Sequence, residues 1–297
     1  AVGYRALFAN TTGTTNTAVG SDALYANTTG INNTALGTGA GKTQTTLHGC
    51  TWVGTDAGRV NIASNNTGVG AGALYSNTTG TQNTAVGTGI YGSTQGALGS
   101  NTTGDHNTAV GSRSLVLNTT GSSNTAVGDR ALQANTTQSN NTAVGYRALI
   151  SNSTADQNTA VGADAMYTNS TGEYNTAVGF MALYSNTTAN GNVAFGYQTL
   201  LNNSTGNRNT ALGYQCLASV TTSAYNTAVG YAAGDAINTG EGNTLLGDFA
   251  GSGITSSNHN VAIGRNCLSL GTDGIQENVA IGYAAMYNNT GGDYNVA

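Results

Sequence analysis

Apolar and polar residues recur along the chain in a pattern with a period of 17 residues. Each unit begins with Asn-Thr-Ala-Val-Gly, continues as roughly Tyr-Arg-Ala-Leu-Tyr-Ser, and ends with Asn-Thr-Thr-Gly and two variable residues. The glycine of the first motif recurs from Gly3 to Gly282; thirteen of its sixteen intervals are 17, and the others are 16, 24 and 18. A repeat this short cannot bury a core alone, so successive units must stack on one another.

We number the places of each unit from the Asn of Asn-Thr-Ala-Val-Gly. The alternation in this motif predicts a short strand. Places 2 and 4 hold Thr or Val and a larger aliphatic residue, as at Thr17 and Val19, and we expect them to face inward. Place 3 is nearly always Ala and is expected to form a flat outer strip of small side chains. Place 9, usually Leu, is a second inward anchor, as at Leu24.

Two turns complete the unit. Glycine at place 5 permits a corner with positive φ, and Asn-Thr-Thr-Gly turns the chain again because Asn and Gly tolerate left-handed backbone. Stacked units bring the Asn residues of place 12 into a column, where aligned amides can hydrogen-bond as a ladder. The corner glycines include Gly20, Gly37, Gly54, Gly128, Gly145, Gly162, Gly179, Gly196, Gly213, Gly230, Gly247 and Gly264.

The predicted fold class is therefore all-β, a parallel β-solenoid (β-roll or β-helix) of about 17 coils. Each coil is expected to hold two short strands and two turns; one strand plus a single helical turn is the alternative. We expect residues 1–297 to form a single continuous solenoid, with irregular units near 50–54 and 88–110. The chain opens and stops within a motif, so we expect it to be a fragment of a longer chain.

Two of the units, Asn260-Val261-Ala262-Ile263-Gly264 and residues 278–282, resemble the head repeat of trimeric autotransporter adhesins. The Asn-Thr-Ala-Val-Gly form resembles repeats of large bacterial surface proteins and phage fibre-like proteins. The resemblance implies a left-handed parallel β-roll wound as a trimer, although the adhesin repeat is shorter than the one here.

Charge and composition narrow the function classes. Only 7% of residues are charged, the net charge is −5, and Lys42 is the one lysine, so the chain lacks the basic stripe that nucleic-acid binding needs. No apolar stretch approaches membrane-spanning length. His48, His106 and His259 have no neighbours at metal-ligand spacing. We expect no enzyme, cofactor or metal site.

The cysteines and the charges predict structural roles. Cys216 and Cys267 both fall at place 8, three units apart, which is too far for a disulfide within the chain. With Cys50 they are predicted to be small buried residues, and an interchain bridge is the alternative. Charged residues gather at places 6, 7, 16 and 17, a pattern typical of a solvated edge.

Three surface features are candidates for recognition. The irregular units hold Trp52 and the insertion 90–96, either as tolerated irregularity or as receptor-contacting loops. Tyrosines at places 6 and 10 are predicted to stack in structural rows. Asn-Thr-Thr or Asn-Ser-Thr triplets fit both a turn and the N-glycosylation pattern. Those candidate glycosylation sites are Asn10, Asn27, Asn77, Asn101, Asn118, Asn135, Asn152, Asn169, Asn186 and Asn203.

Together these observations favour a structural, non-enzymatic extracellular fibre protein, the stiff stalk or adhesin body of a microbial surface. Each coil offers few aliphatic side chains, so we expect self-association, as a homotrimer through the Ala strip or as an end-to-end polymer. A host receptor or glycan is the other candidate partner. The alternatives are a virion tail-fibre spacer that carries a receptor-binding tip, and a glycan-binding module.

Overall fold

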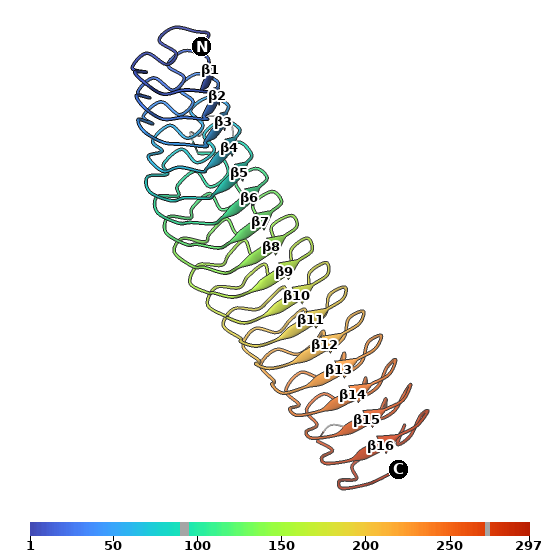
Figure 1. The fold of residues 1–297 in the computed structure, drawn as a ribbon. Helices are drawn as coiled ribbons and strands as arrows, with labels where there is room; N and C mark the ends of the chain where they lie inside the picture. The colour runs from blue at the N-terminus through green and yellow to red at the C-terminus, as the bar shows by residue number, and fades with distance from the viewer. Residues whose placement is uncertain (90–94, 271–273) are drawn as a thin grey trace. The chain divides into compact units, whose positions relative to one another are not determined.

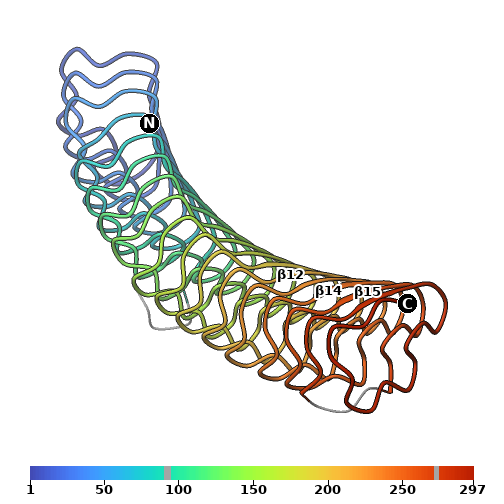
Figure 2. The same cartoon turned by 90° about the horizontal axis from the view of Figure 1, so that it is seen from below.

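The computed structural model describes residues 1–89, 95–270 and 274–297. It confirms the predicted all-β parallel β-solenoid: 16 strands of three residues follow one another, and the described residues contain no helix. The chain divides into two compact units, residues 1–154 and 155–297. Within each unit the backbone winds in coils that lie one upon the next (Figures 1 and 2).

Each coil contributes one strand, taken from places 2 to 4 of the repeat. The strands of the first unit are β1 (Thr17–Val19), β2 (Thr34–Leu36), β3 (Thr51–Val53), β4 (Thr67–Val69), β5 (Thr84–Val86), β6 (Thr108–Val110), β7 (Thr125–Val127) and β8 (Thr142–Val144). Those of the second unit are β9 (Thr159–Val161), β10 (Thr176–Val178), β11 (Val193–Phe195), β12 (Thr210–Leu212), β13 (Thr227–Val229), β14 (Thr244–Leu246), β15 (Val261–Ile263) and β16 (Val279–Ile281).

Neighbouring strands within each unit pair in parallel, like place to like place. In the first unit Ala18 pairs with Ala35, and in the second Ala177 pairs with Ala194. The register survives the 24-residue interval, because Thr84 still pairs with Thr108. The extra residues of this interval fall in the sequence between Gly87 at place 5 and Ala97 at place 8. The insertion 90–96 falls largely on residues 90–94, which lie outside the described part of the chain.

The strand faces are the reverse of the sequence prediction. Ala18 at place 3 is fully buried, whereas Thr34 and Leu36 at places 2 and 4 are exposed, Leu36 by 48%. The strand alternates, and the Asn at place 1 points inward because its amide bonds a turn carbonyl inside the coil. Place 3 must then also face inward, and the narrow interior admits only a small side chain. The predicted outer Ala strip does not exist.

The wall opposite the strands consists of turns, so the prediction of a second strand in each coil is wrong for the described residues. In one coil Asp22, Leu24 and Asn32 have φ of 57°, 48° and 59°, and these places repeat the left-handed conformation along the chain. The Tyr25 N–H donates to the Asp22 carbonyl within the turn (3.3 Å), and the Leu24 N–H donates to the next coil (3.0 Å). The turns thus form a second ladder along each unit.

Place 9 supplies the large side chains of the core, as the sequence predicts. Most coils place a fully buried Leu or Met there against the buried Ala residues of places 3 and 8. These residues are Leu24, Leu74, Leu98, Leu115, Leu132, Leu149, Met166, Leu183, Leu200, Leu217 and Leu268.

Two regions exchange large and small residues between places 3 and 9. Trp52 replaces the strand Ala and is fully buried, while Gly41 and Gly58 replace Leu in two adjacent coils. A Cβ on Gly41 would lie 2.7 Å from the Trp52 ring, and one on Gly58 would overlap it. The Trp52 indole N–H donates to Gln44 Oε1 (2.9 Å). The only tryptophan is therefore core, and the interpretation of residues 50–54 as a receptor-contacting loop is wrong.

Leu245 repeats this exchange in the second unit. It stands at place 3 of β14 and is 1% exposed. Its two methyl carbons reach toward Gly234 and Gly251, each of which holds place 9 in its coil. A Cβ added to either glycine would lie 2.6 or 2.7 Å from Leu245. The large core side chain thus comes from the strand here, and not from the turn wall.

Candidate functional surfaces

The predicted Asn ladder at place 12 is present and runs inside the coils. Asn118 Nδ2 donates to Asn101 Oδ1 (2.9 Å) in the preceding coil and to the Gly121 carbonyl (2.9 Å) of its own turn. Asn135 Nδ2 in turn donates to Asn118 Oδ1 (2.9 Å). Each amide therefore joins two coils and closes one turn, which satisfies buried polar groups that would otherwise destabilise the fold.

The ladder breaks where place 12 is not Asn, and also after Asn186, whose Oδ1 is buried without a partner although Asn203 follows it. Gln44 follows Asn27, and Asn27 Oδ1 is buried without a hydrogen-bond partner. Val220 follows Asn203, whose Oδ1 is likewise unpartnered. Val220 is itself fully buried, so the column changes there from polar to apolar packing.

This ladder holds the residues with the glycosylation pattern. Of the ten, only Asn10 retains exposed surface, and the other nine side chains are fully buried. Their Nδ2 atoms, the atoms that a glycan would modify, point into the coil. In the folded protein the observed role of these residues is the ladder, and glycosylation stays a prediction.

Sequence reasoning missed a second Asn column, at place 1. Asn33 Nδ2 donates to the Leu47 carbonyl (2.7 Å), and the backbone N–H of Asn33 donates to Asn16 Oδ1 (3.0 Å). The same pattern recurs in both units, for example from Asn209 N–H to Asn192 Oδ1 (2.8 Å). The signal was the presence of Asn at place 1 in every unit except that of Cys50, but the reversed strand faces placed these residues outside.

The corner glycines bring consecutive coils into backbone contact. Gly20 has φ of 133°, a conformation that L residues rarely adopt, and a Cβ there would lie 2.6 Å from the carbonyl oxygen of Gly37 in the next coil. All of the predicted corner glycines have φ between 129° and 142°. The corner is therefore a line of bare backbone along each unit.

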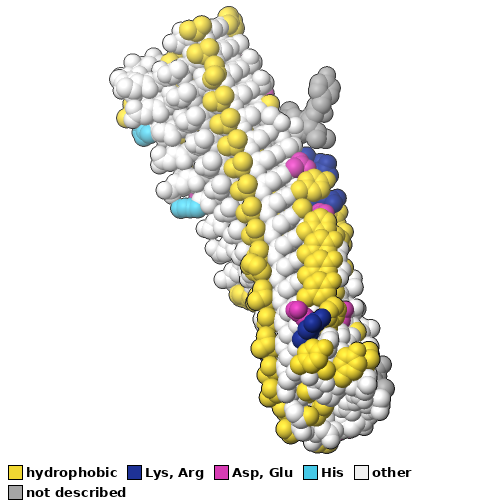
Figure 3. Space-filling model, turned by 90° about the vertical axis from the view of Figure 1, so that its right-hand side faces the viewer, with side chains coloured by type: hydrophobic (Ala, Val, Ile, Leu, Met, Phe, Trp, Pro, Cys, Tyr) yellow, Lys and Arg dark blue, Asp and Glu magenta, His cyan; other side chains and the backbone are white. Residues whose placement is uncertain are grey.

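Two rows of exposed side chains flank this line (Figure 3). We call the place-4 residues the outer apolar row; its most exposed members are Leu36, Phe195, Leu212, Leu246 and Ile281, between 45% and 58% exposed. No strand contains a charged residue. The outer apolar row is thus an uncharged line of apolar side chains on the outward face of the strands in each unit.

The other row is aromatic and occupies place 6, as the sequence predicts. In the second unit Phe180, Tyr197, Tyr214 and Tyr231 stack with ring centroids 5.0–5.5 Å apart and planes within 19° of parallel. Stacking within the row covers the ring faces and leaves the edges exposed. A sugar packs on a ring face, so this row does not offer the surface that a glycan needs.

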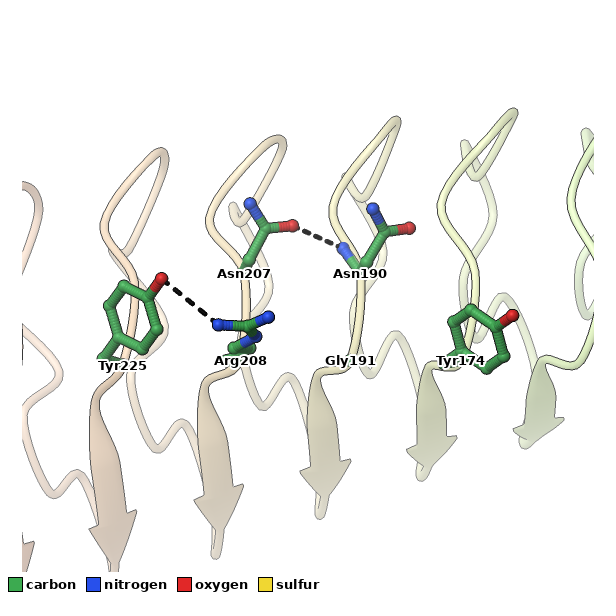
Figure 4. A pocket seen from close by; sticks show the side chains of 6 residues that line it. All are labelled: Tyr174, Asn190, Gly191, Asn207, Arg208 and Tyr225. Atoms are coloured by element: carbon green, nitrogen blue, oxygen red, sulfur yellow. Dashed lines mark hydrogen bonds between the residues drawn. The ribbon is translucent and has the colours of Figure 1, made fainter.

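A different arrangement occurs at the corner formed by places 16 and 17. Tyr174, Gly191, Arg208 and Tyr225 occupy place 17 of four successive coils, with Asn190 and Asn207 beside them. These six residues line a shallow trough of about 370 Å³ (Figure 4). Tyr174 and Tyr225 are 60% and 56% exposed, and Figure 4 shows the rings at the two ends of the trough.

Hydrogen bonds fix the orientation of the amides in this trough. Asn190 Oδ1 accepts from the Glu173 N–H (2.6 Å), and Asn207 Oδ1 accepts from the Asn190 N–H (2.7 Å). The Nδ2 groups of both asparagines are therefore left as outward donors. The Arg208 guanidinium donates to the Tyr225 hydroxyl (3.4 Å) and lies 5.7 Å from the ring centroid.

The three cysteines are buried and free, as predicted. Burial raises the pKa of the Cys216 thiol to about 12, and the thiol donates to the Ala228 carbonyl (3.2 Å). Burial also raises the pKa values of Cys50 and Cys267. Because none of the three is exposed, they are not placed to form the alternative interchain bridge.

Charged side chains are more organised than a solvated edge requires. Asp22 accepts from Lys42 (3.0 Å) and from Arg5 (2.9 Å), and it is only 9% exposed. The hydrogen bond from Lys42, together with that from Arg5, lowers the pKa of the Asp22 carboxyl. In the second unit partial burial raises the pKa of Asp235. The prediction that edge charges are merely solvated is wrong at Asp22.

Within residues 1–89, 95–270 and 274–297 no cluster of three or more His, Cys, Asp and Glu side chains is arranged to hold a metal ion. The same residues contain no helix long and apolar enough to cross a membrane. Comparison of the chain with protein-family models and with curated proteins gave no match.

Proposed function

We propose that this chain is a non-enzymatic structural rod, the stiff body of an extracellular fibre on a microbial or virion surface. The observation that carries the proposal is the like-for-like stacking of coils on every side. The strand, the turn wall and the two Asn columns each bond one coil to the next, as in the Asn118–Asn101 step. Bending a unit would stretch hydrogen bonds on one side of the stack.

The repeat sequence supports the proposed extracellular location of the protein. The Asn-Val-Ala-Ile-Gly units resemble adhesin head repeats, and the more frequent form resembles repeats of bacterial surface and phage fibre-like proteins. A stalk and a tail-fibre spacer need the same property, a length set by the number of coils. The same rod serves both, and what lies at its ends distinguishes them.

The outer apolar row supports association with a second copy of this chain. Its side chains recur once per coil, about 4.8 Å apart, and another copy has the same spacing. Eight strands give a face of roughly 400 Å² per unit at this spacing. Stable interfaces bury about 800 Å² per partner, so rows from both units, or additional chains, must take part. The outer apolar row is thus the proposed face for binding a second copy, instead of the Ala strip expected from the sequence.

Electron microscopy tests the rod. We expect particles whose power spectra contain an axial repeat near 4.8 Å, and whose cross-section counts the chains. Compact particles without this repeat would overturn the proposal.

Sedimentation velocity tests the association. We expect the wild-type chain to form oligomers and Leu212→Lys/Leu246→Lys to sediment as a monomer, because the charges interrupt the outer apolar row. Thr188→Lys/Thr222→Lys is the control, since it adds the same charge at two exposed turn residues and should stay oligomeric. A monomeric wild type, or a row variant that still associates, would contradict the proposal.

A further inference from the structure

The trough between Tyr174 and Tyr225 has the components of a ligand site that the rod does not need. Its coils are already held by the backbone, since the Arg208 N–H donates to the Asn190 carbonyl (3.0 Å) and the Tyr225 N–H to the Asn207 carbonyl (3.1 Å). The exposed rings, the guanidinium and the two free Nδ2 groups add nothing to this ladder.

The lining is rich in hydrogen-bond donors. Asn190 and Asn207 present Nδ2 groups, because their oxygens are occupied by backbone N–H groups. Among the described residues no carboxylate lies within 4.0 Å of the Arg208 guanidinium in an ion pair. Glu173 precedes Tyr174 at one end but is not part of the lining. A ligand with acceptor oxygens and a carboxylate matches this set, since Arg pairs strongly with carboxylates.

The dimensions favour an extended ligand made of rings. Coils lie about 4.8 Å apart, so Tyr174 and Tyr225, three coils apart, are separated by roughly 14 Å. One small planar molecule cannot contact both rings. Linked sugar rings can, because each pyranose offers an apolar C–H face for a tyrosine ring and hydroxyl oxygens for the amide donors.

Gly191 creates the opening between Tyr174 and Arg208. A Cβ at this residue would meet only Arg208 Cγ, at 3.7 Å, so the space above it is empty. Place 17 accepts larger residues in the same left-handed conformation: φ is 67° at Gly191, 59° at Tyr174 and 62° at Tyr225. A side chain is therefore compatible with the fold here, and its absence leaves room for a ligand.

We propose that this trough binds a carboxylate-bearing oligosaccharide of the uronic acid type. Tyr174 and Tyr225 support the sugar rings, Arg208 pairs with a carboxylate, and Asn190 and Asn207 donate to hydroxyl oxygens. The site is open, so the complex is weak at one trough.

Calorimetric titration with a galacturonate hexamer tests the site, with a neutral galactose hexamer as the matched ligand. We expect the acidic hexamer to bind at least about tenfold more tightly than the neutral one, and its affinity to fall with added salt. Arg208→Gln should remove this preference. No heat of binding at millimolar ligand, or equal affinity for the two hexamers, would overturn the proposal.

Gly191→Tyr tests the location without removing any lining group. The new ring fills the opening, and we expect at least about a tenfold loss of affinity with an unchanged melting temperature. Ser123→Tyr is the control: it adds the same ring at place 17 in the first unit, where φ is 58°, and should leave binding unchanged. Undiminished binding by Gly191→Tyr would place the sugar elsewhere and overturn the proposal.

Discussion

An asparagine side chain has two donor hydrogens and one acceptor oxygen, and in the middle of the place-12 column the interior uses all of them. At place 12 Asn118 donates to Asn101 and Gly121 and accepts from Asn135. At place 1 the oxygen accepts a backbone N–H and the Nδ2 group closes the turn. The coil is too narrow for a conventional apolar core, and buried amides fill the remaining space at little cost wherever their donors and acceptors are bonded. The exceptions are the Oδ1 atoms of Asn27, Asn186 and Asn203.

Replacing one of these amides should therefore be costly. We expect Asn118→Ala to lower the free energy of unfolding by about 3 kcal/mol, because the Asn101 oxygen and the Gly121 carbonyl lose their donor inside the coil. Thr120→Ala, at an exposed residue of the same turn, should change it by less than about 0.5 kcal/mol. Urea denaturation of the two variants checks the difference, and equal midpoints would mean that the ladder contributes no stability.

The buried thiol of Cys216 predicts a loss of stability in alkali. Its pKa is about 12 in the folded chain and near the ordinary 9.0 when unfolded, so the folded state binds more protons between these values. The free energy of unfolding should then fall as pH rises above about 9, by about 1.4 kcal/mol per pH unit from this thiol, with no contribution below that pH.

Cys216→Ala isolates this effect, because Ala is the usual residue at place 8. We expect the variant to lose stability less steeply between pH 9 and pH 11 in chemical denaturation, and to match the wild type at pH 7 more closely than at pH 11. The same slope in both proteins would show that the thiol ionises in the folded state.

At the scale of the element, each wall of the coil can supply the core volume. Most coils use Ala in the strand and Leu in the turn, whereas Trp52 and Leu245 reverse this against glycines at place 9. Close packing constrains the total volume of the side chains inside the coil. The large residue can therefore come from either the strand or the turn wall.

A double-mutant cycle tests this exchange. Trp52→Ala alone should destabilise by about 4 kcal/mol because it leaves a cavity, and Gly58→Leu alone should destabilise because its side chain overlaps the indole. Together they recreate the common Ala and Leu pair, so we expect the double variant to be more stable than either single variant. Additive losses in thermal denaturation would refute the exchange.

The strands show which features of the fold the sequence could predict and which it could not. The period predicts the parallel stack, the corner glycines, the Leu anchor and the place-12 column. Each of these depends only on residues at the same place of successive units becoming neighbours. The strand faces could not be assigned, because Val at place 4 is apolar and yet lies outside, while Asn at place 1 is polar and lies inside. A three-residue strand is too short for hydropathy alone to set its phase. The trough could not be predicted from the sequence, because its lining residues become neighbours only when the coils stack. These residues include Tyr174, Gly191, Arg208 and Tyr225.

At the scale of the whole molecule, each coil within a unit depends on its two neighbours and on no distant segment. We expect deletion of residues 124–140, one complete coil of the first unit, to leave a folded solenoid, because the flanking strands can pair like with like. Deletion of 124–132 should instead prevent proper stacking, since it brings unlike places together. Circular dichroism and hydrogen exchange of the two variants check this expectation.

The register between strands has a consequence for the gene. Because Thr84 pairs with Thr108 in the same register as Thr17 with Thr34, a coil with the common Ala at place 3 and Leu at place 9 can follow another coil of that kind in register. Unequal recombination between repeats in the DNA would then lengthen or shorten the protein by whole coils, and the remaining coils would still pair in register. Length in this protein can therefore change in steps of one coil without a change in the kinds of residue that build it.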